Sequence, residues 1–223
     1  MNSSGQRGGP QKIPRPPDAR PGSPPPWHGF TVVPDLDEIC RRVADHRPGV
    51  RFTGAPPPKR NSAVLVALFE DGGEPHVVLT TRSVNLRSHT GEVSFPGGRQ
   101  DDFEPLEVTA LREAEEEIAL GRERVTIVGE LDRLSTFSSK SAIHPFVGRV
   151  DSLPALRPNP AEVDRILLVS LAELASPAVY REERWSSGVY GHERAMHFFE
   201  LVGDTVWGAT ASMLHQLLTL VLD

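Results

Sequence analysis

The segment from Gly98 to Leu120 constrains this chain most, because it predicts a helix with acidic side chains gathered on one side. Residues 107–120 read as strongly helical. At about 100° per residue, Glu113, Glu116 and Glu117 share one arc of the helix surface, and Glu115 points elsewhere. The neighbouring apolar stripe, which we expect to pack on a sheet, consists of Leu111, Ala114 and Ile118.

Three neighbouring carboxylates repel one another, and like charges four residues apart weaken a helix by about 0.3 kcal/mol. A cation should therefore compensate them. Hard divalent cations such as Mg²⁺ prefer oxygen ligands and are held by a few carboxylates while substrate phosphates complete the coordination shell. The alternative is an acidic face that is simply solvated, and the helix alone favours that alternative.

The residues around the helix favour the metal site instead. The pattern G-x5-E-x7-R-E-U-x-E-E-x-G-U is met at eight of its nine positions, namely Gly98, Glu104, Arg112, Glu113, Ala114, Glu116, Glu117 and Leu120. This segment closely resembles the Nudix box of hydrolases that cut a nucleoside diphosphate linked to another moiety. The resemblance implies that Glu113, Glu116 and Glu117 bind Mg²⁺ or Mn²⁺. It also implies that Arg112 orients the glutamates and that the Gly97 carbonyl is a further ligand.

Ala119 stands where the Nudix box has glycine. A glycine just past a helix usually serves a left-handed turn, in which alanine costs about 1 kcal/mol. Gly121 is a candidate to take over that cap. Position 119 supplies no ligand atom, so we expect a local adjustment of geometry. A catalytically weak, nucleotide-binding variant stays open as an alternative.

A second pattern precedes the helix, between Val78 and Gly98. Its matching residues are Leu79, Thr80, Arg82, Ser83, Arg87, Gly91, Phe95, Pro96, Gly97 and Gly98. They resemble the additional motif of the coenzyme A pyrophosphatase subfamily, and the similarity extends over about residues 60–215. The resemblance implies cleavage of coenzyme A or its derivatives to 3',5'-ADP and (acyl-)4'-phosphopantetheine. A Nudix hydrolase of ADP-ribose, NADH or another dinucleotide is the alternative, because the box does not define the leaving group.

Arg82 and Arg87 are the candidate phosphate contacts, since guanidinium groups bind phosphates through paired, charge-assisted hydrogen bonds. Gly98 is the third candidate in the substrate site. Either arginine could instead pair with a neighbouring acid such as Glu92, and His89 reads more readily as an exposed structural histidine. The general base is expected to be Glu116 or Glu117, with Glu162 of the NPAEV segment as a further candidate.

The remaining pattern predicts an α+β domain, a Nudix fold with a mixed sheet between helices. A helix is expected over residues 36–46 with Asp35 as its N-cap. Strands are expected at 63–70, 76–82, 91–95, 125–134, 142–150 and from 165, a hairpin at 197–208, and a closing helix at 209–222. The domain should span residues 27–223. Eight of the 21 prolines fall within residues 1–26, which predicts a disordered or loosely attached tail.

The net charge and the single cysteine limit which partners and which cellular compartment we expect. The net charge of -6 argues against nucleic acid as a partner, because phosphate neutralisation needs a basic face. Residues 101–117 alone carry eight acids against Arg112, so the acidity is concentrated at the proposed metal site. The single cysteine, Cys40, excludes an internal disulfide and suggests the cytoplasm. We expect no membrane span. The closing apolar helix and the segment around Trp27 are candidate contacts for a homodimer.

Overall fold

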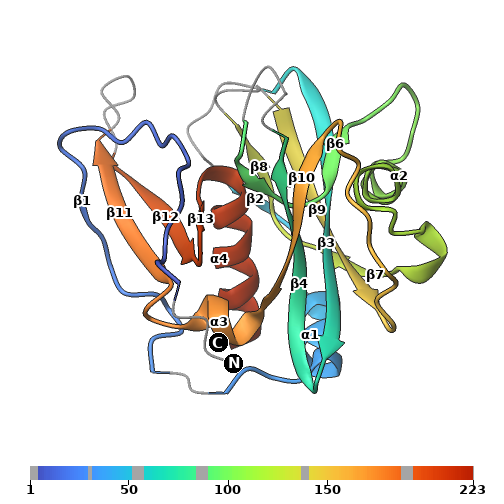
Figure 1. Cartoon of the computed structure of the whole chain (residues 1–223), viewed down its shortest axis with the longest axis horizontal. Helices are drawn as coiled ribbons and strands as arrows, with labels where there is room; N and C mark the ends of the chain where they lie inside the picture. Colours follow the sequence, from blue (N-terminus) through green and yellow to red (C-terminus); the bar gives the residue numbers. More distant parts are fainter. Residues whose placement is uncertain are drawn as a thin grey trace.

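The computed structural model describes residues 5–29, 32–51, 58–83, 90–136, 141–186 and 193–222. These residues form four layers (Figure 1): a four-stranded sheet, the helix α4, a nine-stranded sheet, and the helix α2. The prediction of an α+β fold with a mixed sheet between helices is confirmed. The separate four-stranded sheet was not predicted.

Helices begin and end close to the predicted positions. The described helices are α1 (Leu36–Asp45), α2 (Leu106–Ile118), a 3-10 turn η1 (Arg122–Arg124), α3 (Leu171–Ala175) and α4 (Gly208–Leu222). Asp35 caps α1 as predicted, because its side chain accepts a hydrogen bond from the backbone N–H of Glu38 at 2.8 Å. None of these helices is long and apolar enough to cross a membrane.

The nine-stranded sheet is mixed. Its strands are β2 (Val50–Arg51), β3 (Arg60–Asp71), β4 (Glu74–Arg82), β5 (Val93–Ser94), β6 (Gly97–Arg99), β7 (Thr126–Glu130), β8 (Arg133–Ser135), β9 (Ser141–Val150) and β10 (Val163–Ser170). The central strand β3 runs parallel to β9 and antiparallel to β4 and β6, and β10 pairs with the other edge of β4. This order brings the ends of β4, β6 and β10 together beside α2.

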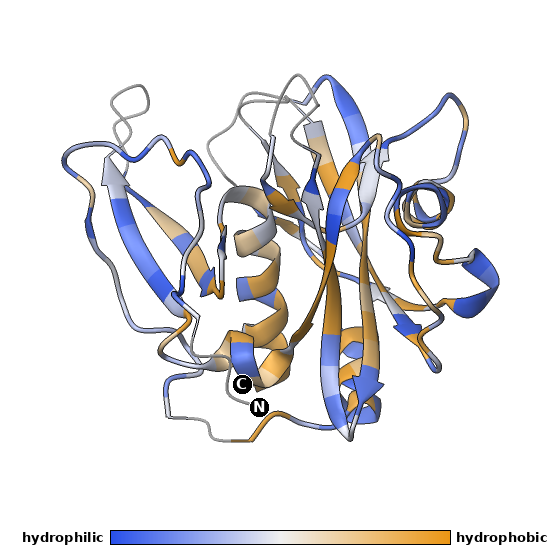
Figure 2. Ribbon diagram, viewed as in Figure 1, coloured by the Kyte–Doolittle hydropathy of each residue, from blue (hydrophilic) through white to orange (hydrophobic). Residues whose placement is uncertain are grey.

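Alternation along β3 divides the core into two parts, because successive side chains point to opposite faces of a sheet. Ala63, Leu65 and Ala67 pack under α2. Val66 and Leu68 face the larger cluster that includes α1 and α4. Figure 2 shows α4 as largely hydrophobic between the two sheets. Burial on both faces of the sheet explains why the strand sequence is almost continuously apolar.

The second sheet is formed by β1 (Arg20–Pro21), β11 (Tyr180–Ser186), β12 (Glu193–Leu201) and β13 (Asp204–Val206). Strands β12 and β13 form an antiparallel hairpin, as predicted for residues 197–208. Strand β11 was not predicted, because its sequence is mostly charged and lacks the apolar pattern of a strand. Its acidic and basic side chains instead bond to each other and to the amino-terminal segment.

The amino-terminal segment differs from the predicted loose tail. Residues 5–29 run along the second sheet (Figure 1). The Gly8 N–H donates to the Leu201 carbonyl at 2.8 Å, and Arg15 pairs with Glu183 at 2.8 Å. The segment has few apolar side chains to bury, and polar contacts of this kind hold much of it in place. The domain boundary at residue 27 stays a prediction.

The surfaces expected to support a homodimer are occupied within the chain itself. Trp27 is 2% exposed and its indole N–H donates to the Ala175 carbonyl at 3.1 Å. Most of α4 is buried between the two sheets. Trp27 and most of α4 therefore contribute to the core of one molecule, and the homodimer stays a prediction.

Candidate active site

The helix α2 ends in the left-handed turn that the glycine of the Nudix-like pattern would favour. Ala119 itself adopts this conformation, with φ 56° and ψ 32°. Its N–H donates to the Glu115 carbonyl at 3.0 Å, and the Leu120 N–H donates to the Ala114 carbonyl at 3.4 Å. Gly121, with φ -61°, does not take over the cap. The turn is therefore kept, and alanine bears its conformational cost.

Replacing Ala119 by glycine should therefore raise the free energy of unfolding by about 1 kcal/mol, because glycine enters this conformation without a clash of its Cβ atom. Urea denaturation of both proteins measures the change. Catalytic rates should stay within about twofold, since residue 119 holds no group that faces the carboxylates. A large gain in rate would instead mean that the alanine distorts the site.

Arg112 connects the acidic side chains of α2 to the loop before the helix. Its guanidinium bonds to Glu104 through Nε at 3.0 Å and through a terminal nitrogen at 3.1 Å. The other terminal nitrogen lies 3.0 Å from Glu113 and 3.3 Å from Glu116. Thr109 donates a further hydrogen bond to Glu104 at 2.8 Å. Arg112 thus holds two of the three predicted metal ligands in defined orientations.

Glu104 matched the sequence pattern, yet no role was assigned to it. The structure makes it the main anchor of Arg112, which holds the pKa of Glu104 below its usual range. The spacing of eight residues between them offers no helical periodicity, because Glu104 lies before α2 begins. Such a contact is visible only once the loop is folded back onto the helix.

Glu117 is the most deeply buried of the acidic residues of α2, at 3% exposed. Burial raises its pKa to about 8, and the Gly97 N–H, which donates to its carboxylate at 3.3 Å, opposes that shift. Burial also raises the pKa of Glu113. A Cβ atom at Gly98 would lie 2.3 Å from the Glu113 carboxyl carbon. A side chain at position 98 would therefore displace the Glu113 carboxylate from its present place beside the backbone.

Two further predicted residues lie near these carboxylates. The positive charge of Arg82, at the end of β4, works against the raised pKa of Glu117, and the negative charge of Glu162 adds to it. The Glu162 carbonyl accepts from the Ser83 N–H at 2.8 Å, and the Asn159 N–H donates to the Glu117 carbonyl at 2.8 Å. The loop that carries Glu162 is therefore tied both to the end of α2 and to the end of β4.

Arg82 has an incompletely satisfied side chain. Its Nε atom is buried and has no hydrogen-bond partner among the described residues. A buried N–H without a partner costs about 1–3 kcal/mol, so an anionic acceptor at this position would be stabilising. Arg87 and His89 lie outside the described residues.

The side chains suit a divalent cation by chemistry, because Glu113, Glu116 and Glu117 offer carboxylate oxygens and a cation would favour the ionised form of the buried one. In the described part of the chain, no three acidic, histidine or cysteine side chains are already grouped so that they would hold a metal ion. Arg112 engages Glu113 and Glu116, whereas Glu117 bonds to Gly97. Binding a cation would therefore require these carboxylates to turn toward one another.

Comparison with known proteins places this site in a family. The NUDIX domain family matches residues 59–188. The uncharacterised Nudix hydrolase NudL of Photorhabdus laumondii is 37% identical over 169 residues, 73% of this chain and 88% of that protein. The peroxisomal coenzyme A diphosphatase NUDT7 of Mus musculus is 32% identical over 166 residues, 74% of this chain and 68% of that protein.

A solved structure supports the fold. The MutT/nudix family protein from Enterococcus faecalis matches 85% of this chain and 70% of its own, with a TM-score of 0.50 and 14% sequence identity. At that identity the likeness concerns the fold alone.

Proposed function

This chain belongs to the Nudix hydrolase family, which acts on pyrophosphate bonds of nucleoside diphosphate derivatives, and we propose that its substrate is coenzyme A or a derivative. The products would be 3',5'-ADP and (acyl-)4'-phosphopantetheine. The proposal rests on one observation: the buried Nε atom of Arg82 has no hydrogen-bond partner among the described residues. Arg82 lies in the segment that resembles coenzyme A pyrophosphatases, and its positive charge acts on the carboxylate of Glu117.

Similarity to the mouse coenzyme A diphosphatase supports the same substrate. Coenzyme A carries a pyrophosphate and a 3'-phosphate, so its recognition needs cationic donors in addition to the metal site. Arg82 supplies one such donor, and Arg87 remains the second candidate. Gly98 lets the backbone lie against the Glu113 carboxylate, and it stays the third candidate in the substrate site.

In the proposed mechanism, Arg112 holds Glu113 and Glu116 in position, and the Gly97 N–H orients Glu117. When bound, Mg²⁺ or Mn²⁺ would lower the pKa of the attacking water and would neutralise charge on the phosphate oxygens. Glu113, Glu116 and Glu117 would hold that ion, with the Gly97 carbonyl as a further ligand. Glu116 or Glu117, or alternatively Glu162, takes the proton from the attacking water. Arg82 binds the phosphate group.

Purified protein should cleave coenzyme A in the presence of Mg²⁺, and excess EDTA should abolish the reaction because the carboxylates alone cannot activate water at neutral pH. Coenzyme A, acetyl-coenzyme A, ADP-ribose and NADH are supplied in parallel, and the products are separated by chromatography. Faster cleavage of ADP-ribose than of coenzyme A would overturn the substrate assignment. No cleavage of any of the four would favour a nucleotide-binding role.

A further inference from the structure

Gln11, far outside the matched family region of residues 59–188, joins the second sheet to the nine-stranded sheet. Its side-chain N–H groups donate to the Gly91 carbonyl at 3.0 Å and to the Asp204 carboxylate at 3.1 Å. Its side-chain oxygen accepts from the Thr205 N–H at 2.8 Å. One amide group therefore bonds to β13 on one side and to the turn before β5 on the other.

The turn that Gln11 holds is bonded directly to the backbone of Arg82. The Gly91 N–H donates to the Arg82 carbonyl at 3.0 Å, and the Arg82 N–H donates to the Glu92 carbonyl at 2.9 Å. Gly91 therefore lies between Gln11 and the end of β4, bonded to both. A displacement of Gly91 would move the backbone from which the Arg82 side chain extends.

Asp204 makes the second connection. Asp204 is 1% exposed, and its carboxylate accepts hydrogen bonds from Arg165 on β10 at 3.0 and 3.2 Å. Arg165 lies opposite Thr81, the residue before Arg82, in the β10–β4 register. A buried carboxylate needs its partners, because an uncompensated charge in the interior is strongly destabilising. Gln11 thus completes a network that reaches Arg82 from both edges of β4.

We propose that Gln11 is a positioning residue for substrate binding, which acts by fixing the backbone at Arg82. The inference rests on the proposed function, because Arg82 matters in this way only if it binds the substrate's phosphate. In this proposal the amino-terminal segment, through Gln11, supports a residue of the active site. A contact that binds ground state and transition state equally affects KM and leaves kcat unchanged.

The test is a kinetic comparison of Gln11→Ala with wild type on coenzyme A. We expect KM to rise about tenfold with kcat within about twofold, as for loss of uniform binding. Arg15→Ala is the matched control, since Arg15 belongs to the same segment and bonds to Glu183 on β11 without reaching Gly91. It should leave KM within about twofold of wild type. An equal rise in KM for both variants would overturn the proposal and indicate general loosening of the segment.

A double-mutant cycle with Arg82→Ala separates positioning from an independent structural effect. If Gln11 acts through Arg82, Gln11→Ala should change kcat/KM by less than about twofold in that background, because coupled residues are not additive. Full additivity would contradict the proposal. Hydrogen exchange gives a readout that does not need activity. Gln11→Ala should speed hydrogen exchange of the Gly91 amide about tenfold. Unchanged protection of that amide would contradict the inference even if coenzyme A is cleaved.

If the wild-type protein cleaves none of the four nucleotides, the proposed function fails. The rate of hydrogen exchange at the Gly91 amide in Gln11→Ala then remains as the test of whether Gln11 fixes the backbone at Arg82. Accelerated exchange would then uphold this role of Gln11, and unchanged exchange would reject it. The two failures are therefore distinguishable.

Discussion

Replacing Glu117 by glutamine is expected to lower kcat for pyrophosphate cleavage by about a thousandfold, the order lost when a key electrostatic group is removed from an active site. Burial raises the pKa of Glu117 to about 8, so without a cation the carboxyl group is largely protonated at neutral pH. Glutamine resembles this neutral form. The substitution should therefore leave the stability of the metal-free protein nearly unchanged while removing a proposed metal ligand.

Thermal denaturation with and without Mg²⁺ tests whether Glu117→Gln loses metal binding while the metal-free protein keeps its stability. Mg²⁺ should raise the Tm of the wild-type protein, because a ligand that binds only the folded state stabilises it, and should not raise that of Glu117→Gln. Glu115→Gln is the matched control on the same helix, since Glu115 pairs with Arg122 at 3.2 Å. It should retain wild-type rates. A Glu117→Gln protein with more than a tenth of wild-type activity would exclude Glu117 from the metal site.

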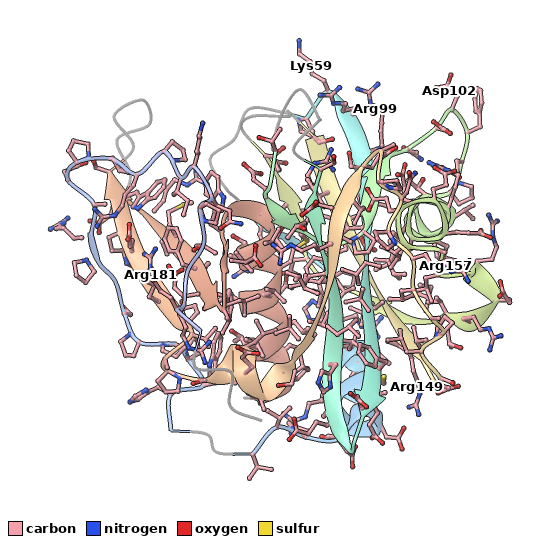
Figure 3. The ribbon with its side chains drawn as sticks, in the orientation of Figure 1. Lys59, Arg99, Asp102, Arg149, Arg157 and Arg181 are labelled. Carbon is pink, nitrogen blue, oxygen red and sulfur yellow. The ribbon has the colours of Figure 1, made fainter. Side chains whose placement is uncertain are left out.

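The sequence predicted the layers around α2 well because burial and helical periodicity act over short stretches. The central strands β3 and β4 and the helices α1, α2 and α4 follow directly from apolar spacing. The second sheet did not follow, apart from its β12–β13 hairpin. Its strand β11 carries Arg181, which pairs with Glu183 and Glu200 and lies 3.9 Å from the centre of the Phe198 ring. Figure 3 labels Arg181 on this outer sheet. The contacts of Arg181 with Glu200 and Phe198 cross from β11 to β12, so they depend on residues distant in sequence.

In the proposed site, too, contacts set by local spacing were predicted and contacts between distant residues were not. Fixed spacing in the Nudix-like pattern identified Arg112 and the three glutamates, and the structure brings Arg112 against two of them. The contacts of Glu104 with Arg112 and of Gln11 with Gly91 arise from chain reversal, for which no local pattern exists. Their separations of 8 and 80 residues show why periodicity could not reveal them. The roles of these residues in catalysis remain predictions.

A stacked pair of histidines connects α4 to the second sheet. His215 of α4 lies over His197 of β12, with ring centres 3.9 Å apart and an angle of 18° between the rings. Tyr180 bonds to Nδ1 of His197 through its hydroxyl at 2.9 Å, and Nδ1 of His215 is buried without a partner in the described residues. Burial lowers the pKa of His197 to about 3 and that of His215 to about 4. Both rings are therefore neutral in the folded protein near pH 7.

Acidification should destabilise the fold through this pair. Each histidine in the unfolded chain binds a proton near pH 6.5, whereas in the folded state it does so only near its lowered pKa. The stabilising contribution is therefore complete above pH 6.5 and is lost progressively as pH falls toward 4. For His215 alone, linkage gives a loss of roughly 3 kcal/mol between pH 7 and pH 4. His215→Phe keeps an aromatic ring in the stack but removes the proton-binding site.

Urea denaturation at a series of pH values measures this loss. The free energy of unfolding of His215→Phe should fall less steeply than that of wild type between pH 6.5 and pH 4, because only the variant lacks the extra proton uptake on unfolding. His28→Gln is the control, since His28 is exposed and its removal should leave the slope unchanged. Parallel curves for wild type and His215→Phe would mean that the ring is protonated in the folded state with no penalty. The stacked pair would then not limit stability in acid.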